Sequence, residues 1–147
     1  MKKNRHTLLH VDDDALIRAM VADQLESQGY QVIGLADPKD ALRTLLNEDC
    51  RVVLLDVQMP GINGLELLQQ IKAFDGGVQV IMLTGLVSTT TLLESLRRGA
   101  EACLFKPVAN YDRLFDVVAN TFQKLDRWWE AVEEMRCRQG APQPAVN

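Results

Sequence analysis

The sequence predicts an α/β fold in which a parallel β-sheet is covered by helices on both faces. Short apolar runs alternate with longer amphipathic stretches, which is the pattern of repeated strand–helix units. The short runs are apolar over most of their length, as in strands that are buried on both faces. Because crossovers between parallel strands are right-handed, a series of such units favours an open, doubly wound sheet.

Five strands are expected, each near the typical length for a globular domain. They span residues 7–11, 31–35, 52–55, 78–83 and 102–105. Helices are expected between and after them, where apolar residues recur at spacings of three and four. These helices begin near Asp14, Pro38, Gly64, Ser88 and Asn110. Glycines at positions 29, 76, 77 and 99 are expected to close helices in the left-handed conformation.

The composition fits one globular domain, since the 147 residues are 47% apolar and 24% charged. A net charge of −4 disfavours nonspecific binding to nucleic acid or anionic lipid, because both need a basic surface. No stretch approaches the roughly 20 apolar residues of a membrane helix. Cys50, Cys103 and Cys137 are too far apart to suggest disulfides or a zinc site. We therefore expect a cytoplasmic protein without direct contacts to nucleic acid or membrane.

Polar side chains follow the strands at the carboxyl edge of the predicted sheet, where doubly wound sheets bind their ligands. They are Asp12, Asp13 and Asp14 after the first strand, Asp56 after the third, Thr84 after the fourth and Lys106 after the fifth. Converging carboxylates repel one another unless protons or a cation reduce the repulsion. A hard, oxygen-preferring ion such as Mg²⁺ is the expected partner.

We expect Asp13 and Asp56 to be direct Mg²⁺ ligands, with the backbone carbonyl of Gln58 as a third ligand. Asp12 would share the metal or act through water. For Asp14 the favoured role is that of a helix N-cap. The sequence therefore predicts a metal site formed by the ends of the first and third strands.

An ionised Asp56 carboxylate at the centre of this edge is placed to attack phosphorus in line. The Lys106 ammonium and the Thr84 hydroxyl, together with Mg²⁺, would stabilise the charge that develops on the phosphoryl oxygens. Gly64 is expected to shape the loop after Asp56 rather than to contact a ligand. His10, inside the first strand, is expected to be a core histidine that is satisfied by a neighbour.

Four segments resemble motifs of bacterial response-regulator receiver domains of the chemotaxis-regulator type, over roughly residues 7–122. They are VDDD at 11–14, LLDVQMPGINGLELL at 54–68, MLTG at 82–85 and FKP at 105–107. The resemblance implies a flavodoxin-like sheet with strand order 2-1-3-4-5. It also implies Mg²⁺ as cofactor and phosphoryl transfer to Asp56 from a phosphohistidine.

The same resemblance implies a role for each polar residue at the edge of the sheet. Asp12 and Asp13 are the acidic pair, Thr84 is the switch hydroxyl and Lys106 is the phosphate-binding ammonium. The peptide bond between Lys106 and Pro107 is implied to be cis, which X-Pro energetics permit.

The sequence departs from the receiver pattern at Cys103, where such domains usually carry Tyr or Phe three residues before the lysine. A small cysteine does not supply a ring that swings inward when Thr84 moves, so output through the loop after the fourth strand or through dimerisation is expected. Leu86 in that loop is apolar, and we hypothesise that it shields the acyl phosphate and lengthens its life.

The last helix is expected to be unusually long, because residues 110–139 contain neither Pro nor Gly. Apolar residues recur in a heptad pattern at Leu114, Val118, Thr121, Leu125, Trp128, Val132 and Met135. A dimerising coiled coil is one interpretation, and a helix that packs on its own domain or leads into an effector is the other. The expected organisation is a receiver at 1–122, a helical extension at 123–140 and a disordered tail at 141–147.

The favoured function is a two-component switch that is phosphorylated on Asp56 in a Mg²⁺-dependent transfer and responds by changing conformation or dimerising. It is not expected to turn over other substrates. Its partners would be a histidine kinase or phosphotransfer protein and a downstream protein that the sequence does not identify. One alternative is a Mg²⁺-dependent phosphohydrolase, although haloacid-dehalogenase-type enzymes carry an acid at the position of Gln58. The other is a degenerate receiver that acts as an interaction scaffold.

Overall fold

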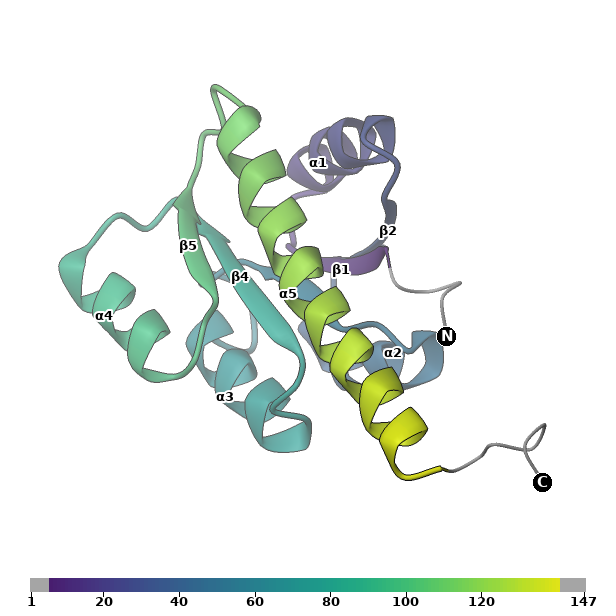
Figure 1. The fold of residues 1–147 in the computed structure, drawn as a ribbon. Helices are drawn as coiled ribbons and strands as arrows, with labels where there is room; N and C mark the ends of the chain where they lie inside the picture. Colours follow the sequence, from purple (N-terminus) through teal and green to yellow (C-terminus); the bar gives the residue numbers. More distant parts are fainter. Residues whose placement is uncertain (1–5, 141–147) are drawn as a thin grey trace.

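The computed structural model describes residues 6–140 and contains a parallel sheet of five strands in the order β2-β1-β3-β4-β5 (Figure 1). The strands are β1 (Thr7–Val11), β2 (Gln31–Leu35), β3 (Val52–Leu55), β4 (Gln79–Thr84) and β5 (Ala102–Phe105). Four strands have the predicted bounds, and β4 is displaced by one residue. The expected doubly wound sheet and its strand order are confirmed.

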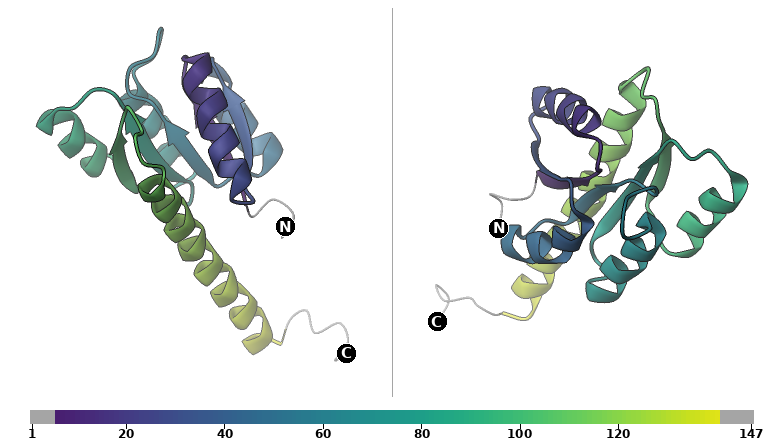
Figure 2. Two further views of the ribbon diagram at one scale, coloured as in Figure 1. Left: turned by 90° about the horizontal axis from the view of Figure 1, so that it is seen from above. Right: turned by 180° about the vertical axis from the view of Figure 1, so that it is seen from behind.

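Helices cover both faces of the sheet (Figure 2). They are α1 (Ala15–Ser27), α2 (Ala41–Glu48), α3 (Gly64–Phe74), α4 (Thr89–Arg97) and α5 (Asp112–Arg138), with a 3₁₀ turn, η2 (Pro38–Asp40), before α2. Buried residues of α1 and α5 belong to one hydrophobic cluster, and those of α2 and α3 belong to a second cluster on the opposite face. Helix α4 contacts α3 and β5.

The central strands are buried on both faces, which explains why the sequence runs are apolar rather than alternating. In β1, Leu8 belongs to the cluster under α1 and α5, whereas Leu9 and Val11 belong to the cluster under α2 and α3. Successive side chains of a strand point to opposite faces, so each strand contributes to both clusters. The sheet is thereby fixed between two helical layers.

Local signals explain where most helices begin and end. Asp14 caps α1 by accepting hydrogen bonds from the backbone N–H groups of Leu16 and Ile17 at 2.9 and 3.2 Å, the role favoured for it. Gly29 and Gly99 follow α1 and α4 with φ of +94°, as expected. The same expectation was wrong for residues 76 and 77, because α3 ends at Phe74 and is followed by Asp75 with extended backbone.

Helix α5 is 27 residues long and continues past the edge of the sheet (Figures 1 and 2). Its first half is part of the core, since Leu114, Val118 and Thr121 are buried. The first positions of the heptad pattern therefore pack within the chain itself, whereas a coiled coil over residues 123–140 remains a prediction. In the second half, Trp128 is 67% exposed. The tail predicted to be disordered, 141–147, lies outside the described residues.

None of the helices between residues 6 and 140 is both long enough and apolar enough to cross a membrane.

Candidate functional site

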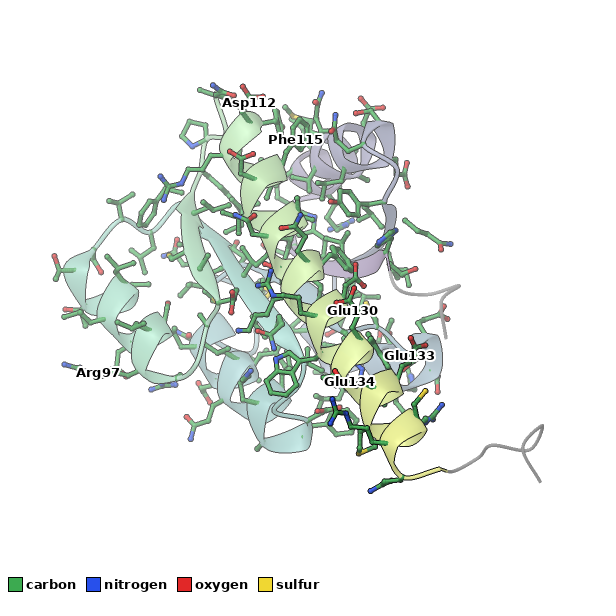
Figure 3. All side chains as sticks on the ribbon, viewed as in Figure 1. Arg97, Asp112, Phe115, Glu130, Glu133 and Glu134 are labelled. Carbon is green, nitrogen blue, oxygen red and sulfur yellow. The ribbon has the colours of Figure 1, made fainter. Side chains whose placement is uncertain are left out.

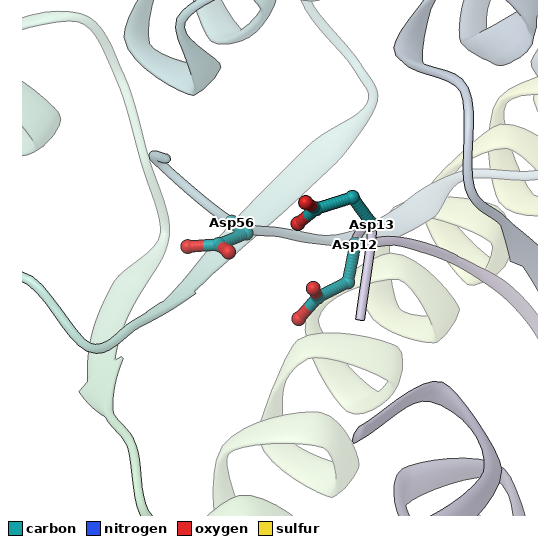
Figure 4. A group of neighbouring side chains, drawn as sticks. All are labelled: Asp12, Asp13 and Asp56. Atoms are coloured by element: carbon teal, nitrogen blue, oxygen red, sulfur yellow. The ribbon is translucent and has the colours of Figure 1, made fainter. Parts of the chain in front are cut away.

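Three carboxylates converge at the carboxyl edge of the sheet (Figure 4). Asp12 and Asp13 directly follow β1, and Asp56 directly follows β3. The two strands are parallel neighbours in which Val11 is paired with Leu55, so their ends bring Asp12 and Asp56 side by side. One carboxylate oxygen from each aspartate lies within 4.8 Å of the others. Asp12 and Asp56 are buried, whereas Asp13 is exposed at the mouth of the site.

Backbone hydrogen bonds hold both strand ends in place. The Asp56 N–H donates to the Val11 carbonyl at 3.1 Å, and the Asp12 N–H donates to the Leu35 carbonyl at 3.0 Å. The Asp12 side chain accepts a hydrogen bond from the Asp14 N–H at 2.9 Å. These bonds continue the sheet beyond its last paired residues, so the acidic side chains stand on a rigid base.

Lys106 joins the two buried carboxylates from the far side of the site. Its ammonium lies 2.6 Å from Asp12 Oδ2 and 3.1 Å from Asp56 Oδ2. Its backbone N–H donates to the Thr84 carbonyl at 2.9 Å, and its peptide bond to Pro107 is cis. Burial lowers the pKa of Lys106, but hydrogen bonds from its ammonium to Asp12 and Asp56 outweigh burial and raise the pKa above its usual value. The ammonium therefore stays charged.

Thr84 is the last residue of β4 and is completely buried at the same edge. Its Oγ1 accepts a hydrogen bond from the Leu86 N–H at 3.1 Å, which ties the hydroxyl to the β4–α4 loop. The Gln58 N–H donates to Asp56 Oδ1 at 3.3 Å. The structure thus brings all six predicted site residues to one edge, and the phosphoacceptor, metal-ligand, phosphate-binding and switch roles assigned to them remain predictions.

The donor set fits a hard divalent cation. One ammonium offsets only part of the charge of three carboxylates, so the group carries a formal charge of −2 when all four are ionised. Oxygen ligands of this kind are the ones that Mg²⁺ prefers. Lys106 forms its ion pairs with Asp12 and Asp56, whereas Asp13 is exposed and leaves an approach for the ion.

Two contacts near the site were not predicted from the sequence. The guanidinium of Arg18, in α1, donates to the Asp12 carbonyl at 2.6 Å and adds a second cation beside the acidic turn. At Gly64, the first residue of α3, an added Cβ would lie 1.9 Å from the Asp56 carbonyl oxygen. Gly64 was expected to shape the loop after Asp56, whereas in the structure the start of α3 lies directly against the backbone of Asp56.

His10 is buried beneath the site, and the expectation that a neighbour satisfies it was wrong. Neither ring nitrogen has a hydrogen-bond partner among residues 6–140, and Nε2 lies 3.8 Å from Asp12 Oδ2. Burial lowers the pKa of His10 to about 4, although the nearby Asp12 carboxylate acts in the opposite direction. His10 is therefore neutral at physiological pH.

Cys103 lies in β5 opposite Met82 and packs against the cluster under α2 and α3. Burial raises the pKa of its thiol, so the side chain behaves as a small apolar group. Phe105, two residues further along, is 37% exposed. No aromatic ring therefore occupies the position that Cys103 takes in this strand.

The fold and the site together define an α/β domain with an acidic, lysine-containing pocket at the carboxyl edge of its sheet. Residues 8–119 match the family model described as the response regulator receiver domain. The chain belongs to this family and is a receiver domain of a two-component response regulator.

Curated relatives and solved structures agree with this assignment. The DNA-binding response regulator MtrA of Mycobacterium tuberculosis is 33% identical over 107 residues, which cover 73% of this chain and 46% of MtrA. The sensor histidine kinase RcsC of Escherichia coli is 36% identical over 114 residues, or 78% of this chain and 12% of RcsC. The chain thus spans slightly less than half the length of MtrA and only 12% of the length of RcsC.

Among solved structures, the CheY-like receiver domain protein from Methanospirillum hungatei has a TM-score of 0.77 and 30% identity, covering 82% of this chain and 96% of that one. The beryllofluoride-activated NtrC4 receiver domain dimer has a TM-score of 0.76 and 27% identity, covering 81% and 98% of the two chains. TrrA from Thermotoga maritima, solved with Mg²⁺ and BeF, has a TM-score of 0.71 and 29% identity, covering 78% and 97%.

Proposed function

We propose that this receiver is a Mg²⁺-dependent switch in which Asp56 accepts a phosphoryl group from the phosphohistidine of a histidine kinase or phosphotransfer protein. The observation that carries the proposal is the placement of the Asp56 carboxylate, 3.1 Å from the Lys106 ammonium and beside two further carboxylates. A lone strand-end aspartate has no such neighbours. The combination supplies a nucleophile, a fixed positive charge and a set of metal ligands.

The residues of this chain would divide the work as follows. An Asp56 carboxylate oxygen forms a bond to phosphorus while the bond between phosphorus and the donor's imidazole nitrogen breaks. Asp12, Asp13, Asp56 and the Gln58 carbonyl would hold Mg²⁺, which when bound neutralises charge on the phosphoryl oxygens. Lys106 is already oriented toward Asp56 Oδ2 and can stabilise the same charge.

The output would run through the β4–α4 loop or through pairing of two copies, since Cys103 provides no aromatic ring. Thr84 Oγ1 already accepts the hydrogen bond of the Leu86 N–H, so a phosphoryl group that attracts the Thr84 hydroxyl would release this contact. The downstream partner is a protein, and we expect no direct contact with nucleic acid from residues 6–140. We expect the switch to act in the cytoplasm and to have no turnover activity on other substrates.

Acyl phosphate formation tests the proposal directly. The chain is incubated with phosphoramidate and Mg²⁺ and its intact mass is measured, with EDTA in a parallel sample. We expect one phosphoryl adduct that is absent in Asp56→Asn and strongly reduced by EDTA. No adduct in the wild-type chain would leave the scaffold alternative, and continuous release of phosphate over many turnovers would indicate a phosphohydrolase instead.

A further inference from the structure

Among residues 6–140, the buried side-chain nitrogen and oxygen atoms without a hydrogen-bond partner both belong to the imidazole ring of His10. The ring is 1% exposed, so solvent does not supply the missing partners. Buried polar groups in native structures are almost always hydrogen-bonded, because an unmade bond costs the free energy of desolvation. This exception lies directly beneath the acidic site, where a polar group can serve the chemistry.

Strand β1 directs His10 and Asp12 to the same face of the sheet, because residues two apart along a strand share a face. This is the face that α1 and α5 cover, and side chains fill the space between these helices and the sheet (Figure 3). The His10 Nε2 atom lies 3.8 Å from Asp12 Oδ2. That separation is about 0.9 Å longer than a typical N–H···O hydrogen bond, so a small shift of either side chain closes it.

Asp12 is completely buried, and its carboxylate depends on two donors. Its Oδ1 accepts the Asp14 N–H at 2.9 Å, and its Oδ2 accepts the Lys106 ammonium at 2.6 Å. The same ammonium bonds to Asp56 Oδ2 at 3.1 Å. Within the described part of the chain, no other hydrogen bond reaches Asp12 Oδ2. Movement of Lys106 away from Asp12 therefore leaves a buried carboxylate oxygen without a donor.

Phosphoryl transfer to Asp56 changes what Lys106 binds. The phosphoryl group of the product carries about two negative charges, which attract the ammonium more strongly than one carboxylate does. Its oxygens lie one P–O bond farther out than the Asp56 carboxylate, so an ammonium that follows them moves away from Asp12. The buried Asp12 anion then lacks a partner, which opposes the transfer. A second donor that replaces Lys106 at Asp12 removes this penalty.

We propose that His10 is a positioning residue that donates its Nε2–H to Asp12 Oδ2 once the Lys106 ammonium has moved to the phosphoryl group on Asp56. The imidazole is unpartnered in the resting chain and gains a partner in the phosphorylated chain, so the cost of its burial favours phosphorylation. The same bond keeps the Asp12 carboxylate oriented toward the metal site while Lys106 is engaged elsewhere. The role of His10 rests on the proposed phosphoryl transfer, whereas its contact with Asp12 is testable without that reaction.

The ring signals of His10 in nuclear magnetic resonance spectra test this contact. The chain has two histidines, so the ring signals of histidine-labelled protein come from His6 and His10 alone. We expect the His10 Nε2–H signal to move downfield when Mg²⁺ and beryllofluoride, a phosphoryl mimic, are added. The signals of the exposed His6 should stay unchanged. Lys106→Met should show the downfield His10 signal in EDTA without the mimic, because Asp12 Oδ2 then has only His10 as a donor.

The rate of adduct formation on Asp56 tests the consequence for phosphoryl transfer. His10→Leu removes the donor and should slow adduct formation about tenfold. His10→Gln keeps a side-chain N–H of similar reach and should restore the rate to within about twofold of the wild-type chain. The matched control is His6→Leu, which removes the other histidine and should react at the wild-type rate.

An unshifted His10 signal in Lys106→Met would overturn the proposal, since His10 and Asp12 would then not meet even when Lys106 is absent. A His10→Leu chain that reacts as fast as the wild-type chain would overturn it as well. So would a His10→Gln chain as slow as His10→Leu, because packing alone would then explain the residue. A wild-type chain that forms no adduct would instead overturn the proposed function, and the Lys106→Met spectrum would still report whether His10 reaches Asp12.

Discussion

At the scale of single residues, Lys106 occupies carboxylate oxygens that a divalent ion also needs. Its ammonium bonds to Oδ2 of both Asp12 and Asp56. The lysine therefore stabilises the site when no ion is present and opposes the ion when it arrives. Loss of Lys106 should therefore slow phosphoryl transfer but strengthen metal binding, so the two effects can be separated by experiment.

We predict that Lys106→Met strengthens Mg²⁺ binding by about tenfold, because a competing cation is lost. The same change should slow phosphorylation of Asp56 by about 100-fold, because the charge that stabilises the transferring phosphoryl group is lost. Titration calorimetry measures the first effect and the rate of adduct formation measures the second. Lys39→Met, which removes an exposed lysine, is the control. An unchanged rate with tighter metal binding would show that Lys106 does not act on the phosphoryl group.

The buried His10 predicts a specific dependence of stability on pH. Its pKa is about 4 in the folded chain against 6.5 as its ordinary value, so between these values the unfolded chain binds a proton that the folded chain does not. Stability is full above pH 6.5 and falls as the pH falls toward 4. We expect a loss of about 2 kcal/mol between pH 7 and pH 5 in urea unfolding.

His10→Leu should remove most of this loss, because it removes the titrating ring and the two unpartnered nitrogen atoms. The variant should therefore gain stability relative to the wild-type chain as the pH falls. If both proteins lose the same free energy of unfolding between pH 7 and pH 5, His10 is not the group responsible.

At the scale of elements, the start of α3 is placed against the backbone that carries Asp56. The Gly64 N–H donates to the Val57 carbonyl at 2.7 Å, and a Cβ at Gly64 would meet the Asp56 carbonyl oxygen at 1.9 Å. Backbone does not yield as a flexible side chain does, so any larger residue must move the helix or the strand end.

We predict that Gly64→Ala lowers the free energy of unfolding by about 2–3 kcal/mol and also slows phosphorylation, because Asp56 is displaced with its peptide. Chemical denaturation and the adduct rate are the two measurements. Gly85→Ala is the matched control, since no atom lies within 4 Å of a Cβ added there, and its stability should stay near that of the wild-type chain. A stable Gly64→Ala chain would mean that the start of α3 shifts freely.

The elements of the sheet were predictable because their signals are local. A buried strand needs a run of apolar residues, and turn residues mark its ends, so four strands have the predicted bounds. In β4 the pattern failed by one residue, because Val78 is buried but its N–H bonds to the Asp75 carbonyl in the preceding turn. Apolar character alone does not distinguish a buried turn residue from the first residue of a strand.

The candidate site was predictable only where residues sit at strand ends. Parallel strands bring their carboxyl ends to one edge, so Asp12, Asp56 and Lys106 were expected to meet. The contact of Arg18 with the Asp12 carbonyl, and the approach of Gly64 to Asp56, depend on helix placement. No spacing in the sequence encodes such distances. The lack of hydrogen-bond partners for the ring nitrogens of His10 could not be predicted either. A sequence pattern indicates that a residue is buried, but not which groups surround it.

At the scale of the whole molecule, the two ends of the sheet carry different features. The carboxyl edge holds the acidic site, and the amino edge holds a groove lined by the two tryptophans in the second half of α5. The buried residues of α5, Leu114, Val118 and Phe122, all precede the extension. The core that positions Asp56 is therefore complete before the helix leaves the sheet, so the two ends should be separable.

We predict that a chain ending at Asp126, which keeps the partly buried Leu125, folds and accepts a phosphoryl group at the wild-type rate. It loses the half-buried contacts of Trp129 and Val132, so its free energy of unfolding should fall by about 2 kcal/mol or less. The pairing of two copies that is proposed as one output route should also be lost from the truncated chain. Denaturation, adduct formation and sedimentation of the two chains measure these outcomes together. A truncated chain that unfolds, or that folds without accepting phosphate, would show that the second half of α5 supports the acidic site across the whole depth of the sheet.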